Sequence, residues 1–152
     1  MSKILLLEDD PLLSATLLDL LRAEGFEVAH AGDGEEALEI TYAQKFDLYL
    51  LDINVPLLNG IDFLKLLRDS GDLTPAFFIS ALRDIKTISH AFDTACDDYI
   101  KKPFDFDELL VRIKAHIVKK NPEIIYGSMR YDLLSKRIFV DEKEVDLGFV
   151  DK

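Results

Sequence analysis

The sequence predicts an α/β fold: a parallel β-sheet with helices on both faces, followed by a short antiparallel β tail. Apolar runs that end in polar or acidic residues alternate with amphipathic stretches five times along the chain, which is the rhythm of successive βαβ units. The apolar runs are continuous rather than alternating, as in strands that are buried on both faces. With 152 residues, the chain is about as long as one average domain.

The first unit consists of a predicted strand and a leucine-rich helix. Lys3–Leu7 continues in Ile and Leu and is the first predicted strand. A helix begins at Pro11, because proline suits the first helical turn, and its leucines recur at helical spacing until Gly25 stops it. Residues 26–31 form the second predicted strand.

The middle of the chain repeats this unit. A turn at residues 32–34 precedes a predicted helix at residues 35–44, and Leu48–Leu51 is the third strand. The loop after Asp52 breaks at Gly60, and the apolar residues that follow recur at helical spacing, which predicts a third helix. Residues 76–79 form the fourth strand.

The fourth and fifth helices differ in their helix propensity. Residues 84–95 include threonine, serine and isoleucine, which lower the propensity of the fourth predicted helix. A short fifth strand at residues 98–100 precedes the last helix, at residues 107–118, which we expect Asp105 to cap.

The pattern changes after residue 119. Residues 120–122 indicate a linker, because Asn121 precedes a proline and such residues avoid the helical conformation. Arg137–Val140 and residues 144–147 alternate polar and apolar side chains as in a β-hairpin, and residues 131–134 are a further candidate strand. We therefore expect a domain at residues 1–119 and the β-rich start of another at residues 123–152.

The composition disfavours several kinds of partner and site. Acidic residues number 29 against 18 basic ones, and the net charge of −11 disfavours binding to nucleic acid or to an anionic membrane. Cys96 is the only cysteine, so an intrachain disulfide and a Cys-x-x-Cys metal site are excluded. The apolar run at residues 4–7 is too short for a membrane span or a signal peptide, which favours a cytoplasmic protein.

Polar side chains follow four of the predicted strands at their carboxyl ends, where parallel sheets bind ligands. They are Glu8, Asp9 and Asp10 after the first strand, Asp52 after the third, Ser80 after the fourth and Lys102 after the fifth. Carboxylates that share a crevice repel each other unless a cation lies among them, and ligands that are all oxygen favour Mg²⁺. Together with the lysine and the hydroxyl, they predict a phosphoryl-group site with Asp52 as the nucleophile.

At these residues the sequence resembles the receiver domain of two-component response regulators. The resemblance covers residues 2–119 and rests on four motifs in the family's order: ILLLEDD at 4–10, LDINVPLLNG at 51–60, SA at 80–81 and DDYIKKPF at 97–104. It implies a flavodoxin-like, doubly wound five-stranded sheet in the order 2-1-3-4-5 with five helices. It also implies a phosphoacceptor switch rather than an enzyme, with a sensor histidine kinase as its partner and only slow loss of the phosphoryl group.

The resemblance assigns the metal and acceptor roles residue by residue. Asp52 would accept the phosphoryl group, and Asp9 would bind Mg²⁺ or Mn²⁺ directly, while Glu8 would act mainly through water. The backbone carbonyl of Asn54 and the carboxylate of Asp52 would complete the metal site.

The remaining site residues of the family also have counterparts here. Lys102 is the lysine that precedes proline, and the Lys102–Pro103 peptide is cis in this family. Ser80 stands where the family has Thr or Ser, and Tyr99 matches the switch aromatic, which is expected to turn inward when Ser80 is drawn to the phosphoryl group. Lys101 lacks the following proline and is interpreted as a surface charge.

The tail resembles the opening strands of an OmpR/PhoB-type winged-helix effector domain. This implies a transcription regulator whose output domain is mostly absent from this chain, so DNA binding is expected only of a full-length form. Members of the subfamily dimerise through the fourth helix, fifth strand and fifth helix by charge pairs, and the matching residues here are Asp98, Glu108, Arg112 and Lys114. Ile88 and Asp84 stand where basic residues are usual, so a weaker or more apolar contact is expected.

Three other interpretations remain open from the sequence. An aspartyl-phosphate phosphatase would need a second acid two residues after the nucleophile, where this chain has Asn54. A phosphorylation-independent interaction module with a receiver fold predicts losses among the acids, the acceptor or the lysine, and none is lost. A flavodoxin-like domain without phosphochemistry would require these residues to follow successive strands by chance.

Overall fold

Five parallel strands form one sheet in the order β2-β1-β3-β4-β5, which confirms the predicted doubly wound topology. They are β1 (Lys3–Leu7), β2 (Glu27–Ala31), β3 (Leu48–Leu51), β4 (Ala76–Ser80) and β5 (Asp98–Lys101). The computed structural model describes residues 2–120, 123–126, 129–132, 137–140 and 143–145, with side chains as far as residue 117.

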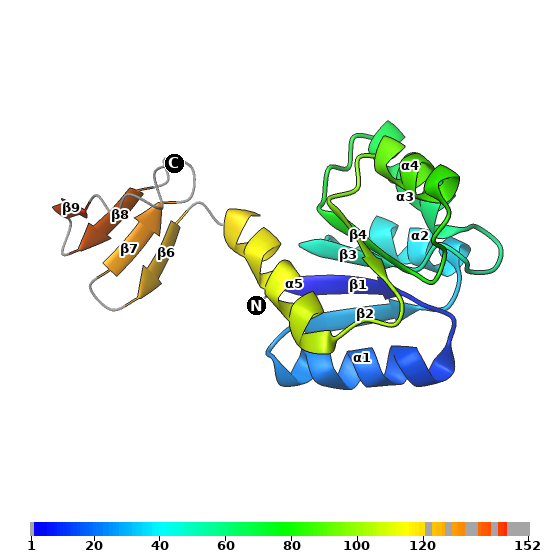
Figure 1. The fold of residues 1–152 in the computed structure, drawn as a ribbon, viewed down its shortest axis with the longest axis horizontal. Helices are drawn as coiled ribbons and strands as arrows, with labels where there is room; N and C mark the ends of the chain where they lie inside the picture. The colour runs from blue at the N-terminus through cyan, green and yellow to red at the C-terminus, as the bar shows by residue number, and fades with distance from the viewer. Residues whose placement is uncertain (1, 121–122, 127–128, 133–136, 141–142, 146–152) are drawn as a thin grey trace. The chain divides into compact units, whose positions relative to one another are not determined.

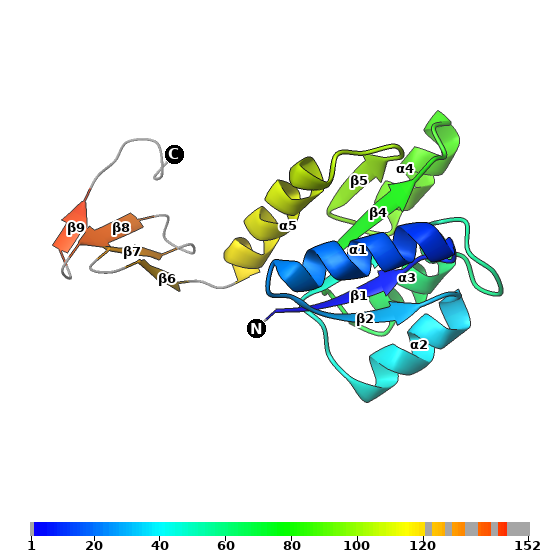
Figure 2. The ribbon, with the colours of Figure 1, turned by 90° about the horizontal axis from the view of Figure 1, so that it is seen from below.

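Five helices accompany the sheet, as predicted. They are α1 (Pro11–Ala23), α2 (Gly34–Ala43), α3 (Gly60–Asp69), α4 (Ile85–Asp93) and α5 (Phe106–Lys120). Helix α1 lies on one face of the sheet, and α2, α3 and α4 lie on the other (Figures 1 and 2). The chain divides into two compact units, residues 1–109 and 110–152, so α5 begins in the first unit. None of the helices in the described part of the chain is long and apolar enough to cross a membrane.

Side chains that accept hydrogen bonds from backbone N–H groups fix the helix starts. The caps of α1 to α4 are Asp10, Asp33, Asn59 and Asp84. Asp84 is thus the cap rather than the first residue of α4, and Thr94 follows its last turn, which makes this helix shorter than the predicted residues 84–95. Asp105 accepts from Asp107 N and caps α5 as predicted, although this helix begins one residue earlier than expected.

A cluster of buried apolar side chains lies between the sheet and the helices α2 to α4. Strand residues such as Leu5, Leu51 and Phe78 are fully buried there, together with Phe63 of α3 and Ala91 of α4. Because β1, β3 and β4 are buried along almost their whole length, their carboxyl ends are held in fixed positions.

The strand register brings the predicted site residues to one edge of the sheet. Leu7 pairs with Leu51, so Glu8 and Asp52 follow neighbouring strands at the same level. Ser80 likewise pairs with Lys101, the residue before Lys102. The chain continues from β1 to β2 on one side, while β3 lies on the other, and such a reversal of strand order is where open α/β sheets bind ligands.

The second unit contains a four-stranded antiparallel sheet in the order β6-β7-β8-β9. Its strands are β6 (Glu123–Tyr126), β7 (Met129–Asp132), β8 (Arg137–Val140) and β9 (Lys143–Val145). β8 coincides with the predicted strand, β7 begins two residues before residue 131, and β6 has no counterpart in the sequence prediction. Residues 133–134 and 146–147 of the predicted strands lie outside the described residues. Helix α5 extends through Lys120, the first residue of the predicted linker, and residues 121–122 are not described.

Candidate functional site

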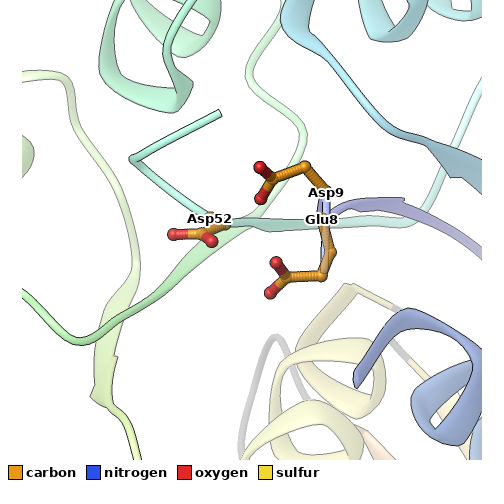
Figure 3. A group of neighbouring side chains, drawn as sticks. All are labelled: Glu8, Asp9 and Asp52. Atoms are coloured by element: carbon orange, nitrogen blue, oxygen red, sulfur yellow. The ribbon is translucent and has the colours of Figure 1, made fainter. Parts of the chain in front are cut away.

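Three carboxylates meet at the carboxyl ends of β1 and β3. One oxygen each from Glu8, Asp9 and Asp52 lies within 4.8 Å of the others, and the three side chains face a common space (Figure 3). Glu8 and Asp52 are buried, with 2% and 7% of their surface exposed, whereas Asp9 is exposed. The cluster is therefore held by the sheet on one side and reaches solvent through Asp9.

Lys102 supplies the positive charge of this cluster. Its Nζ lies 2.7 Å from Glu8 Oε1 and 3.2 Å from Asp52 Oδ2, so the ends of β1, β3 and β5 meet at one ammonium group. Burial lowers the pKa of Lys102, but the hydrogen bond to Glu8 and the charge of Asp52 outweigh it, and the pKa stays above its ordinary value. Lys102 is therefore protonated at neutral pH.

Burial also decides the behaviour of Glu8. The pKa of this carboxyl lies above its ordinary value, chiefly because burial disfavours the charged form and in smaller part because the charge of Asp52 is near. The hydrogen bonds with Lys102 and with Asp10 N act in the opposite direction. Another cation near Glu8 would favour its charged form further, which is the effect that a bound divalent ion would have.

The donor set fits a hard divalent cation. All three side chains offer carboxylate oxygens, and three carboxylates against the single ammonium of Lys102 leave an excess of negative charge. Asn54 is exposed beside the cluster, and its N–H donates to Asp52 Oδ1 at 3.3 Å. Its carbonyl belongs to the loop that follows β3, and its role as a further oxygen ligand, which the resemblance implies, stays a prediction.

Ser80 and Tyr99 are connected through the backbone of Leu82. Ser80 is 1% exposed, and its Oγ accepts a hydrogen bond from Leu82 N at 3.1 Å. The Tyr99 ring is also buried, its hydroxyl donates to Leu82 O at 2.7 Å, and burial raises its pKa. The loop between β4 and α4 therefore contacts both residues that the sequence assigns to the switch, while the switching itself stays a prediction.

The remaining predicted residues are placed as follows. The Lys102–Pro103 peptide is cis, as the resemblance implied, and Lys101 is exposed. Of the predicted dimer face, Asp98 lies on β5, and Glu108, Arg112 and Lys114 lie on α5. The two departures from the subfamily's pattern, Asp84 and Ile88, lie at the cap and within α4.

Two contacts at the site involve residues that sequence reasoning did not single out. A ring nitrogen of His30, on β2, lies 2.8 Å from the backbone oxygen of Glu8. Arg83 donates to the backbone oxygen of Lys102 at 2.8 Å. Both partners are backbone carbonyls 19 or more residues away in the chain, so no motif or spacing indicates them.

An apolar groove of about 560 Å³ lies between α1 and the loop from β5 to α5. Its lining includes Leu12, Leu13 and Leu17 of α1, Pro103 and Phe104 of the loop, and Lys102. Leu12 is 78% exposed at this groove. Leu12 does not belong to the leucine face that the periodicity predicts for α1. Of that face, Leu17 and Leu21 are buried as expected, whereas Leu20 is 38% exposed.

Comparison with known proteins adds an independent observation. Residues 4–114 match the family described as Response regulator receiver domain. The chain is 38% identical over 150 residues to the transcriptional regulatory protein CrdR of Helicobacter pylori, with 95% of this chain and 70% of that protein covered.

Two solved structures are similar as well. The Francisella response regulator 1452 receiver domain superposes with a TM-score of 0.75 at 30% identity, covering 79% of this chain and 99% of that one. The receiver domain of the sensor histidine kinase PA1611 from Pseudomonas aeruginosa PAO1, with a magnesium ion coordinated in its active site cleft, has a TM-score of 0.71 at 27% identity and covers 77% and 98%.

Proposed function

Because the chain belongs to the response regulator receiver domain family, we propose that Asp52 accepts a phosphoryl group from the phosphohistidine of a sensor histidine kinase. The observation that carries this proposal is the contact of Lys102 with both Glu8 and Asp52, which gathers the ends of three strands around one carboxylate. A buried acid with a fixed cation beside it and an open side toward Asp9 is suited to receive an anionic group from outside.

The transfer breaks the P–N bond of the phosphohistidine and forms a P–O bond to a carboxylate oxygen of Asp52. Asp52 attacks as a carboxylate, so no proton needs to be removed from it. The ammonium of Lys102, 3.2 Å from Asp52 Oδ2, lies where it neutralises oxygens of the phosphoryl group during transfer. We propose that Ser80, buried at the end of the neighbouring β4, donates a hydrogen bond to the same group.

The cofactor that we propose is Mg²⁺, with Mn²⁺ as a substitute. Glu8, Asp9, Asp52 and the carbonyl of Asn54 would hold it, in line with the all-oxygen donor set and with the magnesium ion described for the PA1611 receiver domain. When bound, the ion neutralises the excess negative charge of the acids and of the incoming phosphoryl group.

The proposed output is a change in the loop from β4 to α4. Phosphorylation replaces the single charge of the Asp52 carboxylate with a larger phosphoryl group that carries close to two negative charges. A hydrogen bond from Ser80 to this group would change the contacts that both Ser80 and Tyr99 make with Leu82. Because α4 begins directly after this loop, the change would reach the surface of the molecule at α4.

We propose that this surface mediates formation of a homodimer, with Asp98, Glu108, Arg112 and Lys114 as the charged members of the face. Helix α4 would contribute an apolar contact, because Ile85 is 82% exposed and Ile88 and Phe92 follow at helical spacing. The carboxylate of Asp84 accepts hydrogen bonds from Thr87 in the cap and is thereby occupied within α4.

The biological role that we propose is transcriptional control in the cytoplasm. CrdR is a transcriptional regulatory protein, and the similarity covers 95% of this chain. DNA binding would belong to an effector domain of winged-helix type, of which residues 123–152 would be the start. An interaction module that works without phosphorylation would not need the contacts of Lys102 with Glu8 and Asp52. No contact described above favours this alternative.

The test is phosphorylation by a small donor. Incubation with acetyl phosphate and Mg²⁺ is expected to add a mass of about 80 Da, one phosphoryl group, to the wild-type chain and none to Asp52→Asn. A chain that gains no mass, or an Asp52→Asn variant that still gains it, would refute Asp52 as the acceptor. The removal of Mg²⁺ by EDTA is expected to abolish the gain.

A further inference from the structure

The loop from β3 to α3 holds a strained backbone next to the acceptor. Leu57 has φ of +69°, in the left-handed region that leucine rarely adopts, although its side chain is 74% exposed and gains little from packing. Two backbone hydrogen bonds between residues only two positions apart tighten the loop further. They run from Val55 N to Ile53 O at 3.1 Å and from Leu58 N to Pro56 O at 2.8 Å. Such a conformation persists only where the surrounding structure enforces it.

One enforcing contact comes from the first residue of α2. Gly34 is buried, and its N–H donates to Pro56 O at 3.3 Å. A Cβ at this position would overlap the carbonyl oxygen of Leu58 and lie 2.6 Å from the Leu58 Cβ. The overlap is with backbone, so a rotamer change cannot relieve it, and only glycine lets α2 approach the loop this closely.

The other enforcing contact comes from the first residue of α3. Gly60 N donates to Ile53 O at 2.9 Å, and a Cβ on Gly60 would overlap the carbonyl oxygen of Asp52. The loop is thus held at both ends by a glycine at a helix start: by Gly60 beside Asp52, and by Gly34 beside Pro56 and Leu58.

We infer that Gly34 is a positioning residue for the phosphoacceptor site, acting through residues 53–59 without touching any reacting atom. The inference rests on the proposed function of Asp52. The loop it supports carries Asn54, whose N–H donates to Asp52 Oδ1 and whose carbonyl is the proposed fourth ligand of the cation. If Leu58 and Pro56 are displaced, the backbone at Asn54 shifts, and both groups lose their alignment.

The chain offers a matched control two residues away. A Cβ on Gly32 would meet only the end of the flexible Glu36 side chain, at 4.0 Å, so Gly32→Ala is sterically tolerated next to the same helix start. Gly32→Ala and Gly34→Ala add the same methyl group, and only the second one presses on the loop.

Two measurements on the full chain test the inference. Calorimetric titration with Mg²⁺ is expected to give a dissociation constant about ten-fold higher or more for Gly34→Ala, and one within about two-fold of wild type for Gly32→Ala. Hydrogen exchange without any metal is expected to be faster at Val55 and Leu58 in Gly34→Ala, and unchanged in Gly32→Ala. Wild-type Mg²⁺ affinity in a folded Gly34→Ala variant would overturn the inference, whether or not exchange in the loop becomes faster.

A milder variant decides the question if Gly34→Ala does not fold. Asp33→Ala removes the cap that accepts from Glu36 N at 2.7 Å and loosens the start of α2 without any overlap. Weaker Mg²⁺ binding is expected, whereas faster exchange in the first turn of α2 with unchanged Mg²⁺ affinity would overturn the inference. Phosphorylation of the wild-type chain by acetyl phosphate separates the two claims: its absence would refute the proposed function, and its presence leaves the variants to test Gly34 alone.

Discussion

At the scale of single residues, the charge balance of the site depends on Lys102. Its ammonium contacts Glu8 and Asp52, and both carboxylates are buried enough to depend on that charge. Without it, two acids would face each other in a site where burial already raises the pKa of Glu8. This one cation therefore offsets part of the negative charge that Glu8 and Asp52 bring together.

Replacement of Lys102 is expected to slow phosphorylation much more than replacement of the neighbouring Lys101. In Lys102→Ala, the rate of labelling by acetyl phosphate should fall by about 100-fold, because a charge aimed at the transferring group is lost. Lys101→Ala is the matched control, since Lys101 is exposed and precedes no proline. Equal rates for the two variants would show that the contact at 3.2 Å from Asp52 has no role in transfer.

Asp72, at the end of the sheet opposite the site, makes the stability of the fold depend on pH. Burial raises the pKa of Asp72, but its hydrogen bonds with Thr74 and with the buried Tyr49 hydroxyl outweigh this, and the pKa lies below its ordinary value of 3.8. A carboxyl with a lowered pKa stabilises the fold above that ordinary value, and the stabilisation is lost as the pH falls through the lowered one.

The substitution Asp72→Asn is therefore expected to lower the free energy of unfolding near pH 7 by about 1 kcal/mol, since Asp72 is partly exposed. Urea unfolding at several pH values should show a constant difference from wild type between pH 5 and 8 and a shrinking one below pH 4. Tyr49→Phe removes the donor of the hydrogen bond from the Tyr49 hydroxyl to Asp72 and leaves the carboxylate in place. A difference that grows toward low pH would contradict this sign.

At the scale of helices and strands, Arg68 ties α3 to two later connections. Its guanidinium donates to the backbone oxygens of Asp72 and Thr74 and, across the chain, to that of Ala95 at 3.0 Å. Ala95 itself has a φ of +59° at the end of α4. Arg68 therefore anchors the segment from which β5 and Tyr99 continue.

We expect Arg68→Lys to be more damaging than an exposed charge change of the same kind. A single ammonium cannot reach three carbonyls at once, so the free energy of unfolding should fall by about 1–3 kcal/mol and hydrogen exchange near residue 95 should accelerate. Arg22 donates to Val28 O at 3.2 Å and is exposed, so Arg22→Lys offers a control. A smaller loss in Arg68→Lys than in Arg22→Lys would argue against the anchor.

The arrangement of strands, helices and site acids could largely be predicted, for physical reasons that particular elements show. Continuous apolar strands leave few topologies, and parallel strands must present their carboxyl ends together, so Glu8, Asp52 and Lys102 converge. The contacts of His30, Arg83, Gly34 and Arg68 could not be predicted, because each is made with a backbone carbonyl, which has no residue type to read. The predicted limits of α4 are too wide for a related reason. Asp84 suits both the first turn of a helix and the capping position before it, and only the backbone conformation decides between the two.

At the scale of the whole molecule, self-association has to overcome the net charge of −11. Copies of an acidic chain repel each other, so an apolar contact at α4 would help a dimer form where charge pairs are incomplete. One helix face is small against the ~1,200 Å² at which stable interfaces begin, so the contact is expected to be weak and to depend on phosphorylation.

Light scattering of the chain with acetyl phosphate and Mg²⁺ tests this. The phosphorylated wild type is expected to associate, and Ile85→Ser is expected to weaken that association, because Ile85 is 82% exposed on α4. Leu73→Ser is the matched control, since Leu73 is 78% exposed but precedes β4, at the opposite end of the sheet from the site. A wild-type chain that stays monomeric with and without acetyl phosphate would refute an α4 contact, as would equal effects of Ile85→Ser and Leu73→Ser.

The most direct test of the account is the position of the phosphoryl group on the chain. After reaction with acetyl phosphate and Mg²⁺, borohydride reduction converts an acyl phosphate into an alcohol, and peptide mass mapping then identifies the modified residue. We predict homoserine at position 52 and at no other acid of the cluster. Reduction at Glu8 or Asp9, or no reduced residue in a chain that binds Mg²⁺, would contradict the assignment of Asp52 as the acceptor.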